Sequence, residues 1–411
     1  MASIAVLVIV LGCAAAQYFK GSLVTAATTA IAAVSAAFAA MGFYEWLAGI
    51  LSRYAGAMAA WGDVIAFAVL FILVFAVLQT AIAQLLREPI DLGHWPEQIG
   101  RPLCGAILGW VVAGALLTAA ALGPLPLGYP YQRFEARRPD PDRPSRVLLN
   151  ADGFVTGWFG LVSRGSLQAI QEQQSFATVH AGFLDQLYLN RLGIGDRVSL
   201  RLGAGTEAIE VPRRAAVWEA PEGITDTEGR PLPAKPGQTL HLVRIGFKNA
   251  VLRDGCPFTL SQLRLVCRPK DLAKRPLAGK GQAVYPAGFM QQARQLAVKG
   301  LDEQVTLETQ DFGKDEPVRW IDFGFYVPNG WVPVLAQFKL NDMVEVPAPA
   351  AADQAPQVIG FEHRREPTPP ADANQPPEPN TPPAPNAAGH EGAGLSGISQ
   401  GVIGGQVTGG N

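Results

Sequence analysis

The histidines of this chain show no spacing that is typical of a metal site. None lies at metal-ligand spacing from another histidine or from a cysteine, and the sequence contains no H-E-x-x-H motif. The five histidines are His94, His180, His241, His363 and His390. We therefore predict no bound metal. His180 falls near the apolar face of an expected amphipathic helix, where a structural residue with a polar partner is the expected role.

Serine chemistry would need a serine framed by glycines, with a histidine and an aspartate beside it. The best candidate is "SRGSL", which holds Ser163 and Ser166 but has no glycine pattern for an oxyanion hole. The segments "LAGKGQ" and "GAGTEAIE" each lack a glycine that a phosphate- or dinucleotide-binding loop needs. We predict no catalytic residue, no cofactor and no enzymatic activity. A divergent membrane-tethered hydrolase with a Ser–Lys dyad stays an alternative, because spacing does not show proximity in space.

Cys256 and Cys267 are the two cysteines outside the hydrophobic spans. They could form a disulfide if their domain faced an oxidising compartment and both lay on neighbouring strands. Two free, buried thiols are the other interpretation, and the one we favour.

Charge is distributed very unevenly along the 411 residues. Residues 1–125 contain four basic and five acidic residues, whereas nearly all other charge lies beyond residue 130. This contrast predicts a membrane part followed by an aqueous part. The net charge of −2 gives no electrostatic reason to expect a nucleic-acid partner. The basic residues at the expected membrane boundaries are Lys20, Arg53, Arg87 and Arg101.

The N-terminal part contains four hydrophobic spans. They cover residues 2–17, 23–43, 64–82 and 103–122. A membrane-crossing helix needs roughly 20 apolar residues, which the last three spans provide and the first only approaches. No basic residue precedes Lys20, so the first span does not resemble a signal peptide, and Cys13 is interpreted as an ordinary apolar residue. We predict a membrane bundle of four transmembrane helices over residues 1–125.

A stripe of small residues marks the fourth span. Gly105, Gly109 and Ala113 recur every four residues and therefore share one face of a helix. Helices in lipid associate through close packing, and such a stripe lets a partner backbone approach. We expect the alanine-rich second span to be the partner and the bulky third span to face lipid.

Three polar side chains lie at or inside the spans. Glu45 and Asp63 lie at span ends, where we expect solvated caps or interface residues. Gln79 lies inside the third span and is expected to hydrogen-bond to a neighbouring helix.

The order of these spans resembles the CvpA family, the colicin V production proteins of bacterial inner membranes. The resemblance lies in the short first span, in "YFKGSL" at residues 18–23, in the small second and bulky third spans, and in "IGRPLCGAILGWVVAGALL" from residue 99 onward. It covers about the first 125 residues. It implies an inner-membrane protein with a role in colicin V production or export, or in envelope maintenance. Some members of similar layout carry an extracytoplasmic serine protease domain after the four spans.

Basic residues lie on both sides of the expected membrane helices, so they do not decide the orientation. The first and third loops contain Lys20, Arg87 and Arg101. The opposite side contains Arg53 and, after the fourth span, Arg133, Arg137 and Arg138. The resemblance to relatives with an external protease domain favours an extracytoplasmic C-terminal part.

A proline- and charge-rich linker is expected over residues 126–150, followed by a soluble domain over 151–345. The domain should begin with two helices, because apolar residues recur every three or four positions in 154–162 and 176–187. The first helix could lie on the membrane surface through its aromatic residues. Packing on its own domain is the interpretation we favour.

Beyond residue 195 apolar residues alternate with polar ones, which is typical of strands. Alternating runs occur in "RVSLRL", "LVRIGFK" and "QLRLVC", and again over 321–327 and 332–338. Asn329-Gly330 separates the last two runs and predicts a tight hairpin, because both residues tolerate positive φ. We expect an α+β domain with a mainly antiparallel, β-sandwich-like sheet arrangement.

Residues 346–411 are rich in proline, alanine and glycine and predict a disordered tail. The leading hypothesis is a non-enzymatic envelope or export component whose aqueous domain binds a partner. The expected partners are the lipid bilayer, other envelope proteins and, as an option, further copies of the chain. A transporter or channel subunit, with the small-residue helices forming a pore, is the main alternative.

Overall fold

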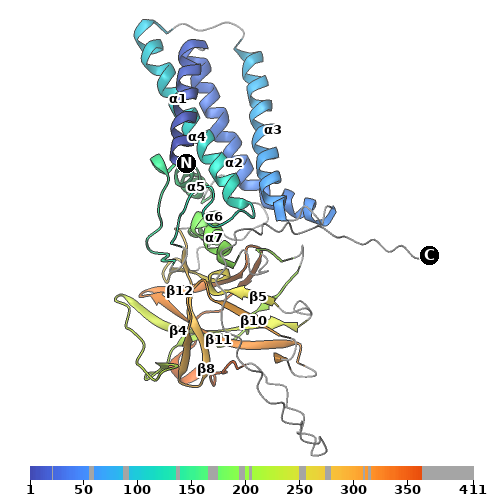
Figure 1. Cartoon of the computed structure of the whole chain (residues 1–411), viewed down its shortest axis with the longest axis vertical. Helices are drawn as coiled ribbons and strands as arrows, with labels where there is room; N and C mark the ends of the chain where they lie inside the picture. Colours follow the sequence, from blue (N-terminus) through green and yellow to red (C-terminus); the bar gives the residue numbers. More distant parts are fainter. Residues whose placement is uncertain are drawn as a thin grey trace, which may run out of the picture. The chain divides into compact units, whose positions relative to one another are not determined.

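The computed structural model describes most of the chain up to residue 362. The described residues are 1–20, 22–54, 60–86, 92–135, 139–164, 175–193, 200–202, 206–249, 256–273, 279–308, 311–312 and 316–362. Four long helices come first, namely α1 (Ala2–Lys20), α2 (Leu23–Tyr54), α3 (Gly62–Leu85) and α4 (His94–Leu122). Short helices and two main sheets follow (Figure 1).

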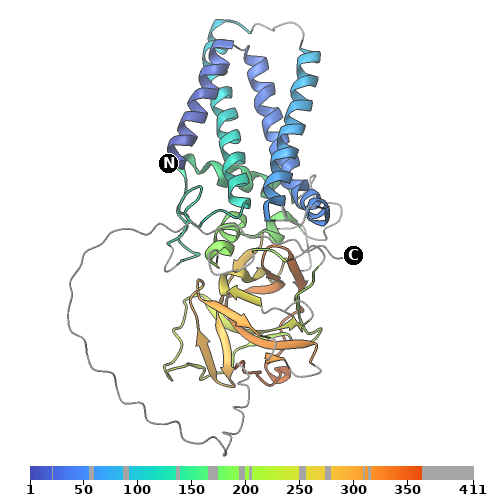
Figure 2. The ribbon, with the colours of Figure 1, turned by 45° about the vertical axis from the view of Figure 1, so that its right-hand side comes forward.

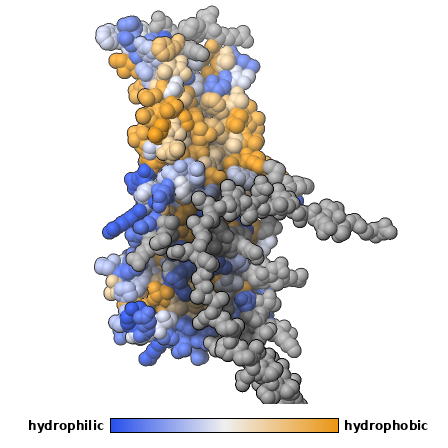
Figure 3. Space-filling view, in the orientation of Figure 1, coloured by the Kyte–Doolittle hydropathy of each residue, from blue (hydrophilic) through white to orange (hydrophobic). Residues whose placement is uncertain are grey.

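The four long helices are each long and apolar enough to cross a membrane, which confirms the predicted spans. The chain is therefore a multi-pass membrane protein. Their surface forms an apolar band with hydrophilic residues at both ends (Figure 3). The helix α2 continues past residue 43 because Tyr44 and Ala48 are buried in one cluster with Phe67 of α3 and with Phe183.

The membrane helices pack side by side in the order α1, α4, α2, α3 (Figure 2). Gly105 and Gly109 of α4 face α1 rather than the expected second span. A Cβ at Gly105 would lie 2.7 Å from the Ala14 Cα, and one at Gly109 would lie 2.6 Å from the Val10 Cα. The two backbones come this close only because these residues have no side chain, and α2 instead lines another face of α4.

A fifth helix, α5 (Ala151–Val162), packs against the membrane helices. The Phe154 ring stacks on Trp110 of α4 with the ring centroids 4.0 Å apart. Gly114 of α4 leaves room for the carbonyl of Ala151, with which any Cβ at this position would collide. The expectation that this helix packs on its own domain therefore holds only in part, because α5 packs mainly on α4 while its Phe159 ring also meets Phe176 at 4.9 Å.

The second expected helix, 176–187, is divided into two. These are α6 (Phe176–Val179) and α7 (Phe183–Leu189). Gly182 lies between them at φ +63°, a left-handed conformation that glycine adopts without strain. The apolar periodicity continues across this break, which is why spacing alone does not detect it.

Two main sheets and a small strand pair form the rest of the domain. The larger sheet has the order β1-β4-β11-β8-β9-β3, with β2 beside β4. Its strands are β1 (Ile209–Glu210), β2 (Val217–Glu219), β3 (Thr225–Asp226), β4 (Gln238–Lys248), β8 (Pro286–Gln292), β9 (Gln295–Val298) and β11 (Val318–Pro328). The second sheet has the order β13-β12-β6-β7. Its strands are β6 (Leu263–Pro269), β7 (Gln282–Val284), β12 (Trp331–Phe338) and β13 (Asp342–Glu345), and the small pair is β5 (Cys256–Thr259) with β10 (Gln304–Leu307).

One apolar core lies between the two main sheets. The larger sheet contributes Val243, Ile245 and Phe323, and the second contributes Leu265 and Phe338. All five side chains are fully buried. Within the described residues the strand pairs are antiparallel except for β3 with β9. The predicted fold class, membrane helices followed by a mainly antiparallel sandwich-like domain, is therefore confirmed.

The predicted hairpin at Asn329-Gly330 is wrong. β11 pairs along its whole length with β4, whereas β12 pairs with β6 in the other sheet. A two-residue hairpin of this kind requires positive φ at both central residues. Gly330 has φ +79°, but Asn329 is not among the positive-φ residues. The turn therefore carries the chain from one sheet to the other. The expected strand "RVSLRL" also fails over its described part, since residues 200–202 form no strand.

The domain continues beyond the predicted start of the tail at residue 346. Val346 and Phe361 are buried in the core between the sheets. The amide of Ala350 donates to the Val217 carbonyl at 2.7 Å, and the amide of Phe361 donates to the Met290 carbonyl at 2.8 Å. This proline-containing segment is ordered because it finds apolar and backbone partners on the larger sheet. Residues 363–411, with His363 and His390, lie outside the described residues.

Candidate functional site

Polar side chains, all but one of them ionisable, gather where the membrane helices meet the α6–α7 segment. We call this cluster the polar seam, and its members are Tyr44, Glu45, Asp63, His180, Gln186 and Arg201. They come from α2, α3, the α6–α7 segment and the stretch 200–202. Together with apolar neighbours they enclose a space about the size of one water molecule.

Two contacts between polar side chains cross the polar seam, and the one between Asp63 and Arg201 is an ion pair. Glu45 Oε1 lies 3.4 Å from His180 Nε2 and accepts a 2.8 Å hydrogen bond from the Tyr44 hydroxyl. Asp63 accepts a hydrogen bond from Arg201 and is only 2 % exposed. Asp63 lies in the first turn of α3, where the helix dipole favours a negative charge. Asp63 is therefore not solvated, because the domain supplies Arg201 as its partner, whereas Glu45 beside His180 keeps a side chain that is 35 % exposed.

Arg191, which follows α7, completes the end of α4. Its guanidinium donates to the carbonyls of Ala120 at 2.9 Å and of Tyr129 at 2.8 Å, and also to Ala121. The last carbonyls of a helix have no partner within the helix, and a cation there also suits the helix dipole. Burial lowers the pKa of Arg191 to about 10, which leaves the side chain charged at neutral pH.

The linker contributes a second buried network beside the polar seam. Arg133 Nε donates to Asp185 Oδ1 at 2.7 Å, and its Nη1 donates to the Tyr131 hydroxyl at 2.7 Å. Tyr131 in turn donates to Asp152 Oδ2 at 2.6 Å. Burial raises the pKa of Asp185, although Arg133 opposes this shift. The described part of the linker is thus a packed structural element rather than a solvated connector.

Arg264 of β6 fixes the other side of the α6–α7 segment. It donates to the carbonyls of Ala181 at 2.6 Å and Val179 at 2.9 Å, and to Gln337 Oε1 at 2.7 Å. Gln186 donates to the same Gln337 oxygen at 3.0 Å. Burial lowers the pKa of Arg264. The α6–α7 segment is therefore held to the helices by His180 and to the sheet by Arg264.

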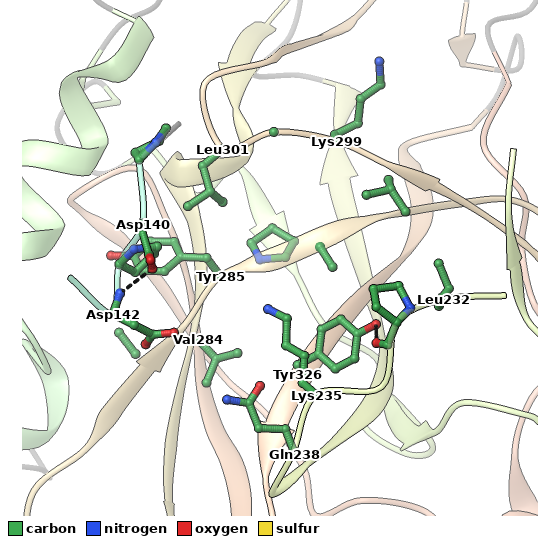
Figure 4. A pocket seen from close by; sticks show the side chains of 18 of the residues that line it. Asp140, Asp142, Leu232, Lys235, Gln238, Val284, Tyr285, Lys299, Leu301 and Tyr326 are labelled. Atoms are coloured by element: carbon green, nitrogen blue, oxygen red, sulfur yellow. Dashed lines mark hydrogen bonds between the residues drawn. The ribbon is translucent and has the colours of Figure 1, made fainter. Parts of the chain in front are cut away.

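A groove of about 680 Å³ opens on the side of the domain (Figure 4). Its floor includes Val284, Leu301 and Tyr326, whose ring lies 4.7 Å from the Lys235 ammonium. β7, the last strand of the second sheet, forms one wall. The charged residues of the rim are Asp140, Asp142, Lys235, Lys299, Asp302 and Glu303. Carboxylates outnumber ammonium groups there, so the groove suits an elongated ligand with apolar and basic groups.

The other predicted site residues do not join either site. Ser163 is buried and donates to the Gly160 carbonyl at 3.0 Å, while Ser166 lies outside the described residues. The ring of His241 lies beside the Thr239 carbonyl. Gln79 Nε2 is buried and has no hydrogen-bond partner within the described chain, so the expected bond to another helix is not formed.

The basic residues at the expected membrane boundaries have different surroundings. Arg101 pairs with Glu97, and this carboxylate also accepts a 2.8 Å hydrogen bond from the Leu23 amide at the start of α2. Arg53 is exposed. The side chain of Lys20 and all of Arg87 lie outside what the structure describes, as do Arg137 and Arg138.

The cysteines of the domain lie on strands that do not pair with each other. Cys267 in β6 has a free, buried thiol between β7 and β12, and burial raises its pKa to about 12. Cys256 begins β5, which pairs with β10. The side chain of Cys256 lies outside the described residues.

Sequence reasoning missed Arg191, Arg201 and Arg264. Each follows or precedes leucine in "NRL" or "LRL", and alternation assigned Arg201 and Arg264 to the polar face of strands. The face of β6 that carries Arg264 is covered by the α6–α7 segment instead. For Arg201 and Arg264, a lone arginine between leucines is the signal that could have suggested a buried partner.

A comparison with protein-family models, curated proteins and solved structures finds no match to this chain. The CvpA resemblance therefore stays a prediction from the sequence of the first 125 residues.

Proposed function

We propose that this protein is a non-enzymatic component of a bacterial inner membrane that holds a partner-binding domain in a fixed position at the bilayer. The resemblance to the CvpA family suggests the process, which is colicin V-like toxin production or export, or envelope maintenance. The same resemblance supports an extracytoplasmic position for the domain.

The observation that carries this proposal is the buried attachment of the domain to the membrane helices. Asp63 with Arg201 and Glu45 with His180 join the two parts, and Arg191 closes the end of α4. A domain that needed only a tether would not require the buried carboxylate of Asp63 at this junction, because taking an ion out of water is costly. A fixed junction sets the direction in which the groove faces.

The groove is the proposed partner site. Its volume of about 680 Å³ lies within the range of ligand sites, and its floor is apolar while its rim is acidic. The outer edge of β7 ends the second sheet, so an extended segment of a partner protein could add to it as a further strand. We propose a partner segment that carries apolar and basic side chains.

Photo-crosslinking in intact membranes tests this function. A photoreactive amino acid at Gln238, in the groove, is expected to capture a defined partner, and the same group at exposed Glu228, away from the groove, is the matched control. Replacing Asp142 and Asp302 by lysine should remove the adduct from Gln238. Equal adducts from both positions, or an adduct that survives the two substitutions, would contradict the groove as the partner site.

A transporter subunit is the second candidate function. The observation in its favour is that two carboxylates, Glu45 and Asp63, lie partly or fully buried at the domain-side ends of membrane helices. Intramembrane ionisable residues often mark ion pathways. Flux of protons or small ions through liposomes containing the purified chain, lost in a Glu45→Gln variant, would favour this function over a purely binding one.

A further inference from the structure

The exposed face of α5 is apolar, and its polar side chains point inward. Gly157, Trp158 and Leu161 share one face and form the outer stripe, and the half-buried Phe154 borders it. Trp158 is 39 % and Leu161 is 58 % exposed, whereas Asp152 is 1 % exposed. A helix on the surface of a water-soluble domain shows the opposite arrangement.

The contacts of α5 place this stripe beside the membrane-crossing surface. Trp110 of α4 stacks on Phe154, and the Trp158 ring meets Phe38 of α2 edge to face at 5.6 Å. The start of α1 is also close, since the Leu148 amide donates to Ser3 Oγ at 3.4 Å. The outer face of α5 is therefore continuous with the apolar surface of α1, α2 and α4.

The turn before α5 exposes two further leucines. Leu148 is 39 % and Leu149 is 54 % exposed. Leu149 and Asn150 both have left-handed backbones, with φ of +58° and +46°. Leucine seldom adopts this conformation because it is strained, whereas asparagine tolerates it. In water, the strained turn would expose two leucines, and nothing would offset its cost in free energy. In lipid, the favourable transfer of each leucine out of water would offset that cost.

We propose that α5 and the Leu148–Leu149 turn form a fifth membrane element, which lies in the plane of the domain-side leaflet. The face formed by Leu148, Leu149, Trp158 and Leu161 contacts lipid. The bilayer surface on this side then runs along α5, and the lipid bilayer is the partner of this face. An interfacial helix of this kind presents its aromatic and leucine side chains to the boundary between headgroups and acyl chains.

Site-specific fluorescence tests this placement in the full-length protein. The native cysteines are replaced by alanine, and Leu161→Cys is labelled with an environment-sensitive dye after reconstitution into phosphatidylcholine–phosphatidylglycerol vesicles. Val298→Cys in β9, at an apolar position with similar exposure, is the aqueous control, and Leu73→Cys in α3 is the membrane control. Bromolipids with bromine near the headgroup should quench the Leu161 label strongly, and iodide in the buffer should quench it roughly tenfold less than the Val298 label.

Two results would overturn the proposal. Iodide quenching of the Leu161 label equal to that of the Val298 label would place α5 in water. Protection from both iodide and bromolipids would show that protein, such as a second copy of the chain, covers the face. Trp158→Cys gives an independent reading of the same face if Leu161→Cys fails to fold, and Leu73→Cys confirms in each case that the helices are inserted.

Discussion

The contact between α1 and α4 and the contact between the α6–α7 segment and the second sheet are stabilised in opposite ways. Gly105 and Gly109 bring two helix backbones together by having no side chain at all. Arg264 joins its partners with a long, charged and fully buried side chain. Lipid gives no hydrophobic drive between helices, so close packing decides there. In the aqueous domain the apolar core already provides that drive, and buried charges then fix one arrangement of the segments that cover it.

The largest effect is expected from a substitution that breaks the contact between α1 and α4. Gly109→Leu forces a side chain against the Val10 Cα, so the free energy of unfolding in detergent should fall by roughly 3 kcal/mol. Gly12→Leu is the matched control, because a Cβ at Gly12 meets nothing within 4 Å. Thermal unfolding of the purified variants measures both. Equal melting temperatures for the two variants would show that close packing does not stabilise this pair of helices.

The next largest effect is expected from a substitution that removes the buried charge of Arg264. Arg264→Met keeps the length of the side chain but leaves the Ala181 and Val179 carbonyls without their donor, so we expect a loss of about 2 kcal/mol in stability. Arg230→Met is the control, because its ion pair with Asp226 is exposed to solvent and should contribute little. Chemical denaturation followed by tryptophan fluorescence reports the difference. A stabilised Arg264→Met variant would mean that an apolar junction serves the domain better than the charged one.

A smaller effect concerns the junction between the two regions. Asp63→Ala and Arg201→Ala should each destabilise the protein, and the double variant should lose less than the sum, with a coupling of roughly 1 kcal/mol. The coupling should persist in high salt, because Asp63 is buried away from mobile ions. Purely additive losses would show that these two residues act separately.

The smallest expected effect concerns the thiol of Cys267, which should not react in the native protein. Cys267 lies in the sandwich core, and a pKa raised to about 12 leaves almost no thiolate at pH 8. Maleimide should therefore modify Cys267 only after denaturation, as peptide mass spectrometry can determine. Modification of the native protein would indicate that the core opens readily, and a Cys256–Cys267 disulfide in the unreduced sample would contradict the free thiol.

The sequence revealed those elements whose environment is uniform along their length. A bilayer demands about twenty apolar residues in a row, so the four spans are visible in composition. Apolar residues alternate with others along β4 and β11, so these strands are visible as well, although the structure buries both faces of β11 over residues 321–327. The polar seam was not predictable, because Glu45, His180 and Arg201 are far apart in the chain and meet only through folding. The turn at Asn329-Gly330 misled for the same reason, since local turn chemistry does not say which sheet the next strand joins.

Arg191 also has a consequence for the order of events during synthesis. It lies 71 residues after Ala120, whose carbonyl it binds at the end of α4. At ordinary translation rates of about 5–20 residues per second, Arg191 is synthesised about 4–14 s after this last turn. The helix is therefore synthesised before its capping residue. The last carbonyls of α4 gain this partner only when the segment after α7 has folded into place. A chain that ends before Arg191 would contain all four membrane helices, but the last turn of α4 would lack these hydrogen bonds and should unwind.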